Sequence, residues 1–166
     1  MSNALFKTDF DSTYEQTPYK LTPRKVKPIY IGGSMKNEQV MDLAKNLRAA
    51  GVEVFDDWIS SGPDADDHWK TYEEDRGRTY IEALQGAHAK NVVEFDKFNI
   101  DRSDAFVMVL PCGRSAHIEL GYCIGVGKPA YIVLTSDHDR WDVMYAMATK
   151  VFQTADDFAA FMIEQK

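Results

Sequence analysis

Asp104-Ala-Phe-Val-Met-Val-Leu-Pro-Cys-Gly-Arg-Ser-Ala-His-Ile-Glu119-Leu-Gly-Tyr122 is the stretch of sequence that decides the fold. It predicts a strand over residues 105–110, a short polar loop, and a helix that carries Glu119 in its first turns. An unbroken apolar run is typical of a strand buried on both faces of a parallel sheet, and ligands of such sheets bind at the carboxyl ends of the strands. We therefore expect Glu119 at a binding crevice. The helix dipole also favours a glutamate near a helix start, so the local residues leave a structural role equally open.

Strands and helices alternate along the rest of the chain as well. Predicted strands end at the glycine pair 32–33 and cover residues 52–55, 130–134 and 150–153, and predicted helices cover residues 37–50, 116–126, 141–148 and 154–164. Residues 56–67 form a polar loop long enough to be a lid, and residues 69–102 are mostly helical with a break near Gly77 or Gly86. This order predicts an α/β fold: a single flavodoxin-like or Rossmann-like domain over residues 26–166, with a five-stranded parallel sheet flanked by helices. Residues 1–25 lack periodicity and are expected to be an N-terminal extension.

Composition narrows the classes of function. A chain of 166 residues with 45% hydrophobic content is expected to form one domain, and its net charge of −7 argues against a nucleic-acid or anionic-membrane partner. Without an apolar signal segment or a stretch long enough to span a bilayer, the chain is expected in the cytoplasm. Cys112 and Cys123 form no disulfide framework or paired metal-ligand motif, so neither a metal nor another cofactor is expected. Cys112 is also a poor candidate nucleophile, because His117 is the only base near it in the sequence.

Three parts of the chain are expected to face the same ligand. They are the turn Gly32-Gly33-Ser34 after the first strand, the loop from Cys112 to His117 after the third strand, which includes Gly113, Arg114 and Ser115, and the end of the helix before the third strand. Neighbouring strands at the switch point of this topology bring the turn and the loop to one crevice, where backbone amides, the serines and Arg114 can hold a phosphate. The alternative is that the two glycines serve only a tight turn. The turn lacks the lysine of a Walker loop, so hydrolysis of nucleoside triphosphates is not indicated.

An ordered set of motifs over residues 27–134 resembles the nucleoside 2-deoxyribosyltransferase superfamily, which includes 2'-deoxynucleoside 5'-monophosphate N-hydrolases. The set is Ile29-Tyr-Ile-Gly-Gly-Ser34, Phe95-Asp96 with Asp104 ahead of the third strand, Gly113 to Glu119-Leu-Gly-Tyr122, and Gly127-Lys-Pro129. The resemblance implies an N-glycosidase that cleaves a (2'-deoxy)nucleoside or its 5'-monophosphate and passes the sugar to water or to another base. It also implies a homodimer or a higher homo-oligomer.

The resemblance also assigns roles to individual residues. Glu119 would attack C1' of the sugar, Tyr30 would hold that carboxylate, Asp96 would serve the departing base, and Asp104 matches a family aspartate at the strand entrance. Ser34 matches the phosphate-binding serine of the monophosphate hydrolases. The further aspartate that the transferases carry shortly before the glutamate is absent here, where the sequence reads Cys-Gly-Arg-Ser.

These residue types suit the chemistry, although each has a simpler interpretation. Breaking an N-glycosidic bond develops positive charge on the sugar and negative charge on the base, so a carboxylate below the ring and an acid beside the base divide the work. Asp96 is otherwise a solvated helix carboxylate, and Tyr30 a core residue. His117 either contacts the substrate or packs on its helix.

Other features leave two questions open. Trp58, Trp69, His68 and His88 either stack on a base or are ordinary core or interface residues. The alternative function is a nucleotide-binding or sensing module that uses the same crevice without turnover. Such a module would tolerate Glu119→Gln, whereas an enzyme would lose orders of magnitude in rate.

Overall fold

A computed structural model describes residues 28–135 and 141–165; the expected extension at residues 1–25 lies outside the described residues. Five strands form one sheet in the order β2-β1-β3-β4-β5, with every neighbouring pair parallel. The strands are β1 (Ile29–Gly32), β2 (Val54–Phe55), β3 (Ala105–Val109), β4 (Ala130–Val133) and β5 (Lys150–Phe152). The predicted α/β, Rossmann-like fold is confirmed, and β1 and β3 are neighbours at the switch point, as expected.

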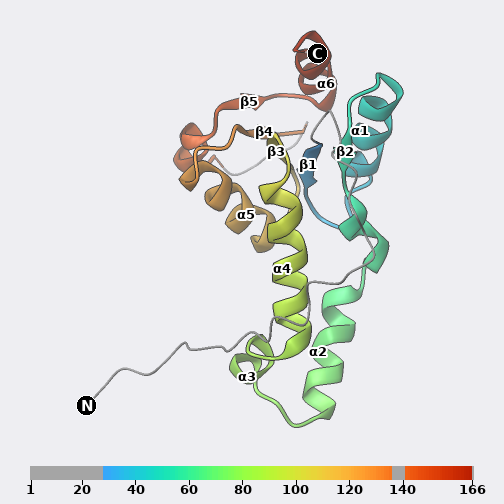
Figure 1. The fold of residues 1–166 in the computed structure, drawn as a ribbon, viewed down its shortest axis with the longest axis vertical. Coiled ribbons are helices and arrows are strands. Elements are labelled where there is room, and N and C mark those ends of the chain that lie inside the picture. The colour runs from blue at the N-terminus through green and yellow to red at the C-terminus, as the bar shows by residue number, and fades with distance from the viewer. Residues whose placement is uncertain (1–27, 136–140, 166) are drawn as a thin grey trace, which may run out of the picture.

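Helices cover both faces of the sheet (Figure 1). The described residues form six α-helices and two 3-10 helices: α1 (Glu38–Ala49), η2 (Asp57–Ser61), α2 (Ala65–Asp75), α3 (Tyr80–Leu84), α4 (Ala87–Asp101), α5 (Arg114–Gly125), η3 (Val143–Met147) and α6 (Ala155–Glu164). Helices α1 and α6 pack on one face, while α5 and the last turns of α4 pack on the other. Each face thus buries its own hydrophobic cluster, as expected for a doubly wound sheet.

The alternation of side chains along β1 places one polar group on the face covered by α4 and α5. Ile29 and Ile31 belong to the cluster under α1 and α6, whereas Tyr30 belongs to the opposite cluster and is only 1% exposed. In the register of the sheet, Tyr30 pairs with Phe106 of β3, and the two rings stack with their centroids 5.5 Å apart. The period of two along a strand therefore directs the hydroxyl of Tyr30 toward the helices that carry the predicted carboxylates.

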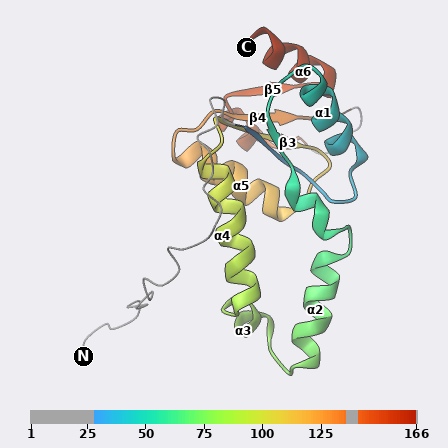
Figure 2. The same ribbon diagram turned by 45° about the vertical axis from the view of Figure 1, so that its right-hand side comes forward.

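Helices α2, α3 and α4 project together from the body of the domain (Figures 1 and 2). This arm replaces the single, once-broken helical stretch expected over residues 69–102, because both candidate glycines interrupt it. Gly77 lies just beyond α2 with φ of +70°, a conformation that favours glycine, and Gly86 is the N-cap of α4. Between them, Thr79 and Glu82 form a capping box that starts α3. Because α2 already begins at Ala65, the polar loop is shorter than predicted and also contains η2.

The C-terminal part differs from the prediction at one element. The helix expected over residues 141–148 is the 3-10 helix η3, whose N-cap Asp142 accepts a hydrogen bond from the backbone N–H of Met144. The last helix is confirmed, and its N-cap Thr154 accepts from the backbone N–H of Asp157. A five-residue segment carries too weak a periodicity to separate the two helix types from the sequence.

Candidate active site

A cavity of about 380 Å³ lies at the carboxyl ends of β1 and β3, between the sheet and the arm. It brings together seven of the eleven residues predicted for the site: Tyr30, Gly33, Ser34, Asp96, Gly113, Ser115 and Glu119. These residues come from β1 and the turn after it, from α4, and from the second turn with α5, so three separate segments of the chain build one site. Its size falls in the range of small-molecule sites, about 300–1,000 Å³.

Tyr30, Asp96 and Glu119 form a connected polar group in this cavity. The hydroxyl of Tyr30 donates to Oδ1 of Asp96 at 3.2 Å and lies 3.5 Å from Oε1 of Glu119. A tyrosine hydroxyl carries only one proton, so it cannot serve both carboxylates fully at once. The two carboxyl groups therefore share one donor, and the longer contact leaves Glu119 the less tightly held of the two.

Burial changes the acidity of this group. Desolvation, together with the nearby charge of Asp96, raises the pKa of Glu119 to about 8, against a lowering effect of the hydrogen bond from Tyr30. Burial also raises the pKa of Asp96, again opposed by the hydrogen bond from Tyr30. The pKa of Tyr30 is raised as well, by burial first and then by the two carboxylates. A proton is thus retained on this pair of carboxyl groups near neutral pH, because burial favours the neutral form of both Glu119 and Asp96.

The two glycines of the first turn are needed for close approach. A Cβ atom on Gly32 would lie 2.5 Å from Cζ of Phe106 and 3.2 Å from Oε2 of Glu119. A Cβ atom on Gly33 would lie 2.6 Å from Cγ2 of Val40. Neither glycine has a positive φ, so their function here is space and not an unusual turn conformation. Gly32 thus makes room for the carboxyl group of Glu119.

The rim of the cavity beyond Gly33 carries hydroxyl and ammonium groups. Oγ of Ser34 accepts from the backbone N–H of Lys36 at 3.2 Å, and both side chains line the cavity. Asn37 links this turn to the loop after β3, because its Nδ2 donates to the carbonyl of Pro111 at 3.2 Å while its Oδ1 caps α1. The second loop continues into the N-terminus of α5, where Gly113 and Ser115 line the same cavity. Such a rim has the donors that an anion requires.

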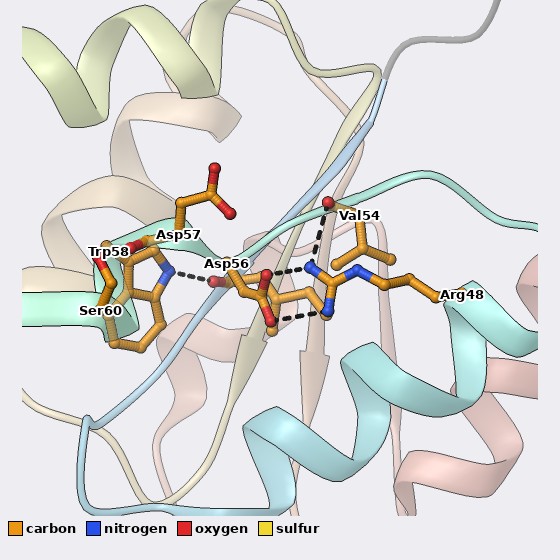
Figure 3. Close-up of polar contacts among 7 residues, drawn as sticks. Arg48, Val54, Asp56, Asp57, Trp58 and Ser60 are labelled. Carbon is orange, nitrogen blue, oxygen red and sulfur yellow. Dashed lines mark hydrogen bonds and ion pairs between the residues drawn. The ribbon is translucent and has the colours of Figure 1, made fainter. Parts of the chain in front are cut away.

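Trp58 forms part of the cavity wall and is anchored to β1. Its Nε1 donates to the carbonyl of Ile31 at 2.7 Å, as Figure 3 shows. Asp56, two residues earlier, is held by the guanidinium of Arg48, which also lies 3.5 Å from the carbonyl of Val54 (Figure 3). The segment that carries Trp58 is therefore fixed to the sheet, and the indole offers the site a rigid aromatic surface.

Besides Gly32, three of the predicted site residues do not line the cavity. Asp104 precedes β3 and lies at the opposite end of that strand, where its backbone N–H donates to the carbonyl of Pro28. Arg114 is exposed on the first turn of α5. His117 lies near η3, with Nδ1 2.8 Å from the carbonyl of Gly113 and Nε2 3.0 Å from the hydroxyl of Tyr145. Since a carbonyl only accepts, Nδ1 donates, and His117 in its neutral form accepts from the tyrosine.

Sequence reasoning did not single out several residues that line the cavity, among them Met35, Lys36, Asp66, Asp67 and Val92. Lys36 is the most informative, since a cation two residues after a glycine-serine turn is a detectable signal of an anion site. The two aspartates enter the site only because α2 begins earlier than predicted. Val92 lies one helical turn before Asp96 on α4, where the 3.6-residue period identifies it once the helix is known.

Other chemistries find less support among the described residues. Burial and the charge of Glu119 raise the pKa of Cys112 to about 11, so this thiol is protonated at neutral pH. No group of three or more histidine, cysteine, aspartate or glutamate side chains in the described residues is arranged to hold a metal ion. Within residues 28–135 and 141–165, no helix combines the length and the apolar character needed to cross a membrane.

Comparison with known proteins supports the fold. No family model and no curated protein matches the chain. Among solved structures, the chain is similar to the CMP N-glycosidase BcmB of Clostridium botulinum, with a TM-score of 0.51 and 13% sequence identity. The match covers 82% of this chain and 98% of that chain. The chain thus shares the α/β fold of a nucleotide N-glycosidase.

Proposed function

We propose that this chain is an N-glycosidase of the nucleoside 2-deoxyribosyltransferase superfamily. In this proposal it cleaves the bond between sugar and base of a (2'-deoxy)nucleoside or its 5'-monophosphate and passes the sugar to water or to another base. The observation that carries the proposal is the pair of buried carboxyl groups, Glu119 and Asp96, that share the hydroxyl of Tyr30 in one cavity. The fold of the CMP N-glycosidase BcmB supports the same reaction class.

The proposed reaction has two steps. The reactive form is the one in which the proton of the carboxyl pair lies on Asp96 and Glu119 is ionised. An oxygen of Glu119 then bonds to C1' of the sugar while the bond from C1' to the base nitrogen breaks, and Asp96 gives its proton to the departing base. In the second step Asp96 takes a proton from a water molecule or from the incoming base. The oxygen of that water, or the nitrogen of that base, bonds to C1' while the bond from C1' to Glu119 breaks. Tyr30 orients both carboxyl groups through its single hydroxyl proton and stabilises whichever of them carries the charge.

Energetics favour catalysis over simple binding. A carboxylate removed from water destabilises the fold unless it is paired, and no cationic side chain is among the causes that shift the pKa of Glu119 or Asp96. A protein that only binds a nucleotide gains nothing from a buried carboxyl group that has no cationic partner. Perturbed carboxyl groups in a cavity are typical of residues that exchange protons or attack substrates.

The rim of the cavity supports a 5'-monophosphate as the substrate. Ser34, Lys36 and Ser115 line the same cavity as the carboxyl group of Glu119. Lys36 is paired only loosely, 3.5 Å from Oδ1 of Asp64, and its side chain is 64% exposed, so it can turn toward a phosphate. Arg114, on the first turn of α5, is proposed as a second cation that reaches the phosphate from the outside. The name of BcmB, a CMP N-glycosidase, agrees with a nucleoside monophosphate.

The test is a chromatographic assay of base release from nucleosides and 5'-monophosphates, with and without an added acceptor base. Wild type should release free base, and Glu119→Gln should lose at least about three orders of magnitude in rate. Glu94→Gln is the matched control, because Glu94 is an exposed glutamate on α4 and should keep wild-type activity. Release that needs an acceptor base identifies a transferase. Equal activity of wild type and Glu119→Gln, or no release from any substrate, would contradict the proposal.

We further propose that two copies of the chain associate through the arm. Tyr72, Ile81 and Phe98 lie on α2, α3 and α4 and are each more than half exposed, although a projecting arm of a stable monomer is expected to be polar. Light scattering should show a dimer for wild type and a monomer for Ile81→Asp. Ile118→Asp, which changes an equally exposed isoleucine on α5, should stay dimeric. A monomeric wild type would refute this assembly.

A further inference from the structure

A second, larger cavity of about 720 Å³ lies within the arm, between α2, α3 and α4. It adjoins the catalytic cavity, since both are lined by Asp66, Val92 and Ser115 and by three more residues in common. The reaction proposed above does not use this space, because a single nucleoside monophosphate is accommodated by the first cavity alone.

One face of α4 connects the two cavities. His88, Val92 and Asp96 follow each other at intervals of four residues, so they lie on the same side of the helix. His88 lines the arm cavity, Val92 lines both, and Asp96 lines the catalytic cavity. The helical rise places His88 about 12 Å along the axis from the acid that serves the departing base.

The far end of the arm cavity is aromatic. Trp69 and His88 have nearly parallel rings, 16° apart with centroids at 6.1 Å, and Tyr80 meets Trp69 edge-on at 6.3 Å. All three line the cavity. Any nucleobase can stack on such a surface, because every base has a π-face. The indole N–H of Trp69 is also buried without a hydrogen-bond partner among the described residues, and a heterocycle that reached it after a turn of the indole would supply an acceptor.

Two cationic side chains, Lys70 and Arg78, line the arm cavity beside four carboxyl groups, those of Asp66, Asp67, Glu73 and Glu74. The side chain of Lys70 is 68% exposed and only 3.9 Å from Oε1 of Glu74, and Arg78 lies 2.8 Å from the buried carboxylate of Glu73. The second ion pair fixes the wall of the cavity between α2 and α3, whereas Lys70 is free to turn toward a ligand phosphate.

We propose that the arm cavity is a second base-binding subsite, so that the preferred substrate is a nucleotide tethered to a second heterocyclic ring. This inference rests on the proposed N-glycosidase reaction, in which the first nucleotide occupies the cavity of Glu119. The second ring stacks in the box formed by Trp69, His88 and Tyr80. The tether is either a 3'–5' phosphodiester or a 5'–5' pyrophosphate, and both present the same chemistry to the box: a second base with a phosphate near Lys70.

Binding measurements on intact ligands test the subsite. In a Glu119→Gln background, which keeps the ligands uncleaved, titration calorimetry compares CMP with the 5'-phosphorylated dinucleotide pCpC and with NAD+. We expect at least one dinucleotide to bind tenfold or more tightly than CMP, and the better one identifies the tether. Trp69→Ala should weaken the binding of that dinucleotide by about 5- to 150-fold and leave the affinity for CMP unchanged. Trp69→Phe should keep most of the stacking but lose the hydrogen bond, and Trp141→Ala, which removes an 89% exposed indole, should change neither.

Several outcomes would overturn the subsite. One is that neither dinucleotide binds more tightly than CMP, and another is that Trp69→Ala weakens CMP and the dinucleotide equally. A third is that Trp69→Ala turns a dimer into a monomer in light scattering, which would assign the box to the contact between copies. Base release from CMP by wild type without any preference for dinucleotides would refute the subsite and leave the N-glycosidase intact. Absence of base release from every substrate, with preferential binding of a dinucleotide, would refute the enzyme and keep the subsite.

Discussion

Replacing Glu119 by glutamine should stabilise the fold in alkaline solution, although it should abolish activity. Burial and the charge of Asp96 raise the pKa of Glu119 from 4.5 to about 8 in the folded protein. Below pH 4.5 the carboxyl group is neutral in both states, so it leaves the balance between them unchanged. As the pH rises toward 8, the unfolded chain loses this proton while the folded chain keeps it, and the folded state is progressively disfavoured.

The size of this effect follows from the same two pKa values. Across the window between them, the free energy of unfolding falls by about 1.4 kcal/mol for each step of one in pH, and roughly 5 kcal/mol is the upper bound above pH 8. Glutamine has no proton to lose, so the unfolding free energy of Glu119→Gln does not fall with pH for this reason. Part of this gain in stability will be offset, because the protonation of Asp96, whose pKa is also raised by burial, is coupled to that of residue 119.

Urea denaturation at pH 5, 7 and 9 measures the difference in unfolding free energy between Glu119→Gln and wild type. This difference should grow by at least about 2 kcal/mol from pH 5 to pH 9 in favour of the variant. Glu94→Gln, on the exposed side of α4, should show a flat difference over the same range. A flat difference for Glu119→Gln as well would refute the argument that this carboxyl group is buried without a compensating cation.

Further predictions concern the surroundings of the same group. Tyr30→Phe removes the hydrogen bond that lowers the pKa of Glu119, so the rising limb of the pH–rate profile should move to higher pH, and an unmoved limb would contradict the contact. Gly32→Ala should destabilise the fold by about 1–3 kcal/mol in denaturant melts and reduce activity, since its Cβ has no room. Gly121→Ala in α5, where nothing lies within 4 Å, should be neutral or stabilising by up to about 1 kcal/mol. Cys112→Ser should keep activity, and iodoacetamide should label wild type slowly at pH 7, because the pKa of this thiol is raised to about 11.

The sequence by itself determined the sheet and most of the helices. Apolar runs such as residues 105–110 are local features, and a strand buried on both faces needs one in any surrounding. The alternation of strands and helices then fixed the parallel order and the switch point between β1 and β3. The position of Glu119 near the start of α5, at this edge of the sheet, followed from the same alternation.

Only the tertiary structure decided which of the candidate residues meet. Tyr30 contacts Asp96 and Glu119 across 66 and 89 positions of the sequence, and no local pattern encodes such a distance. The ring of His117 lies against Tyr145 of η3, a contact across 28 positions that no local pattern encodes either. Asp104 belongs to the far end of its strand, although the motif includes it. The arm and its second cavity also depend on how three short helices pack, because a helical period shows which face is apolar but not what lies opposite it.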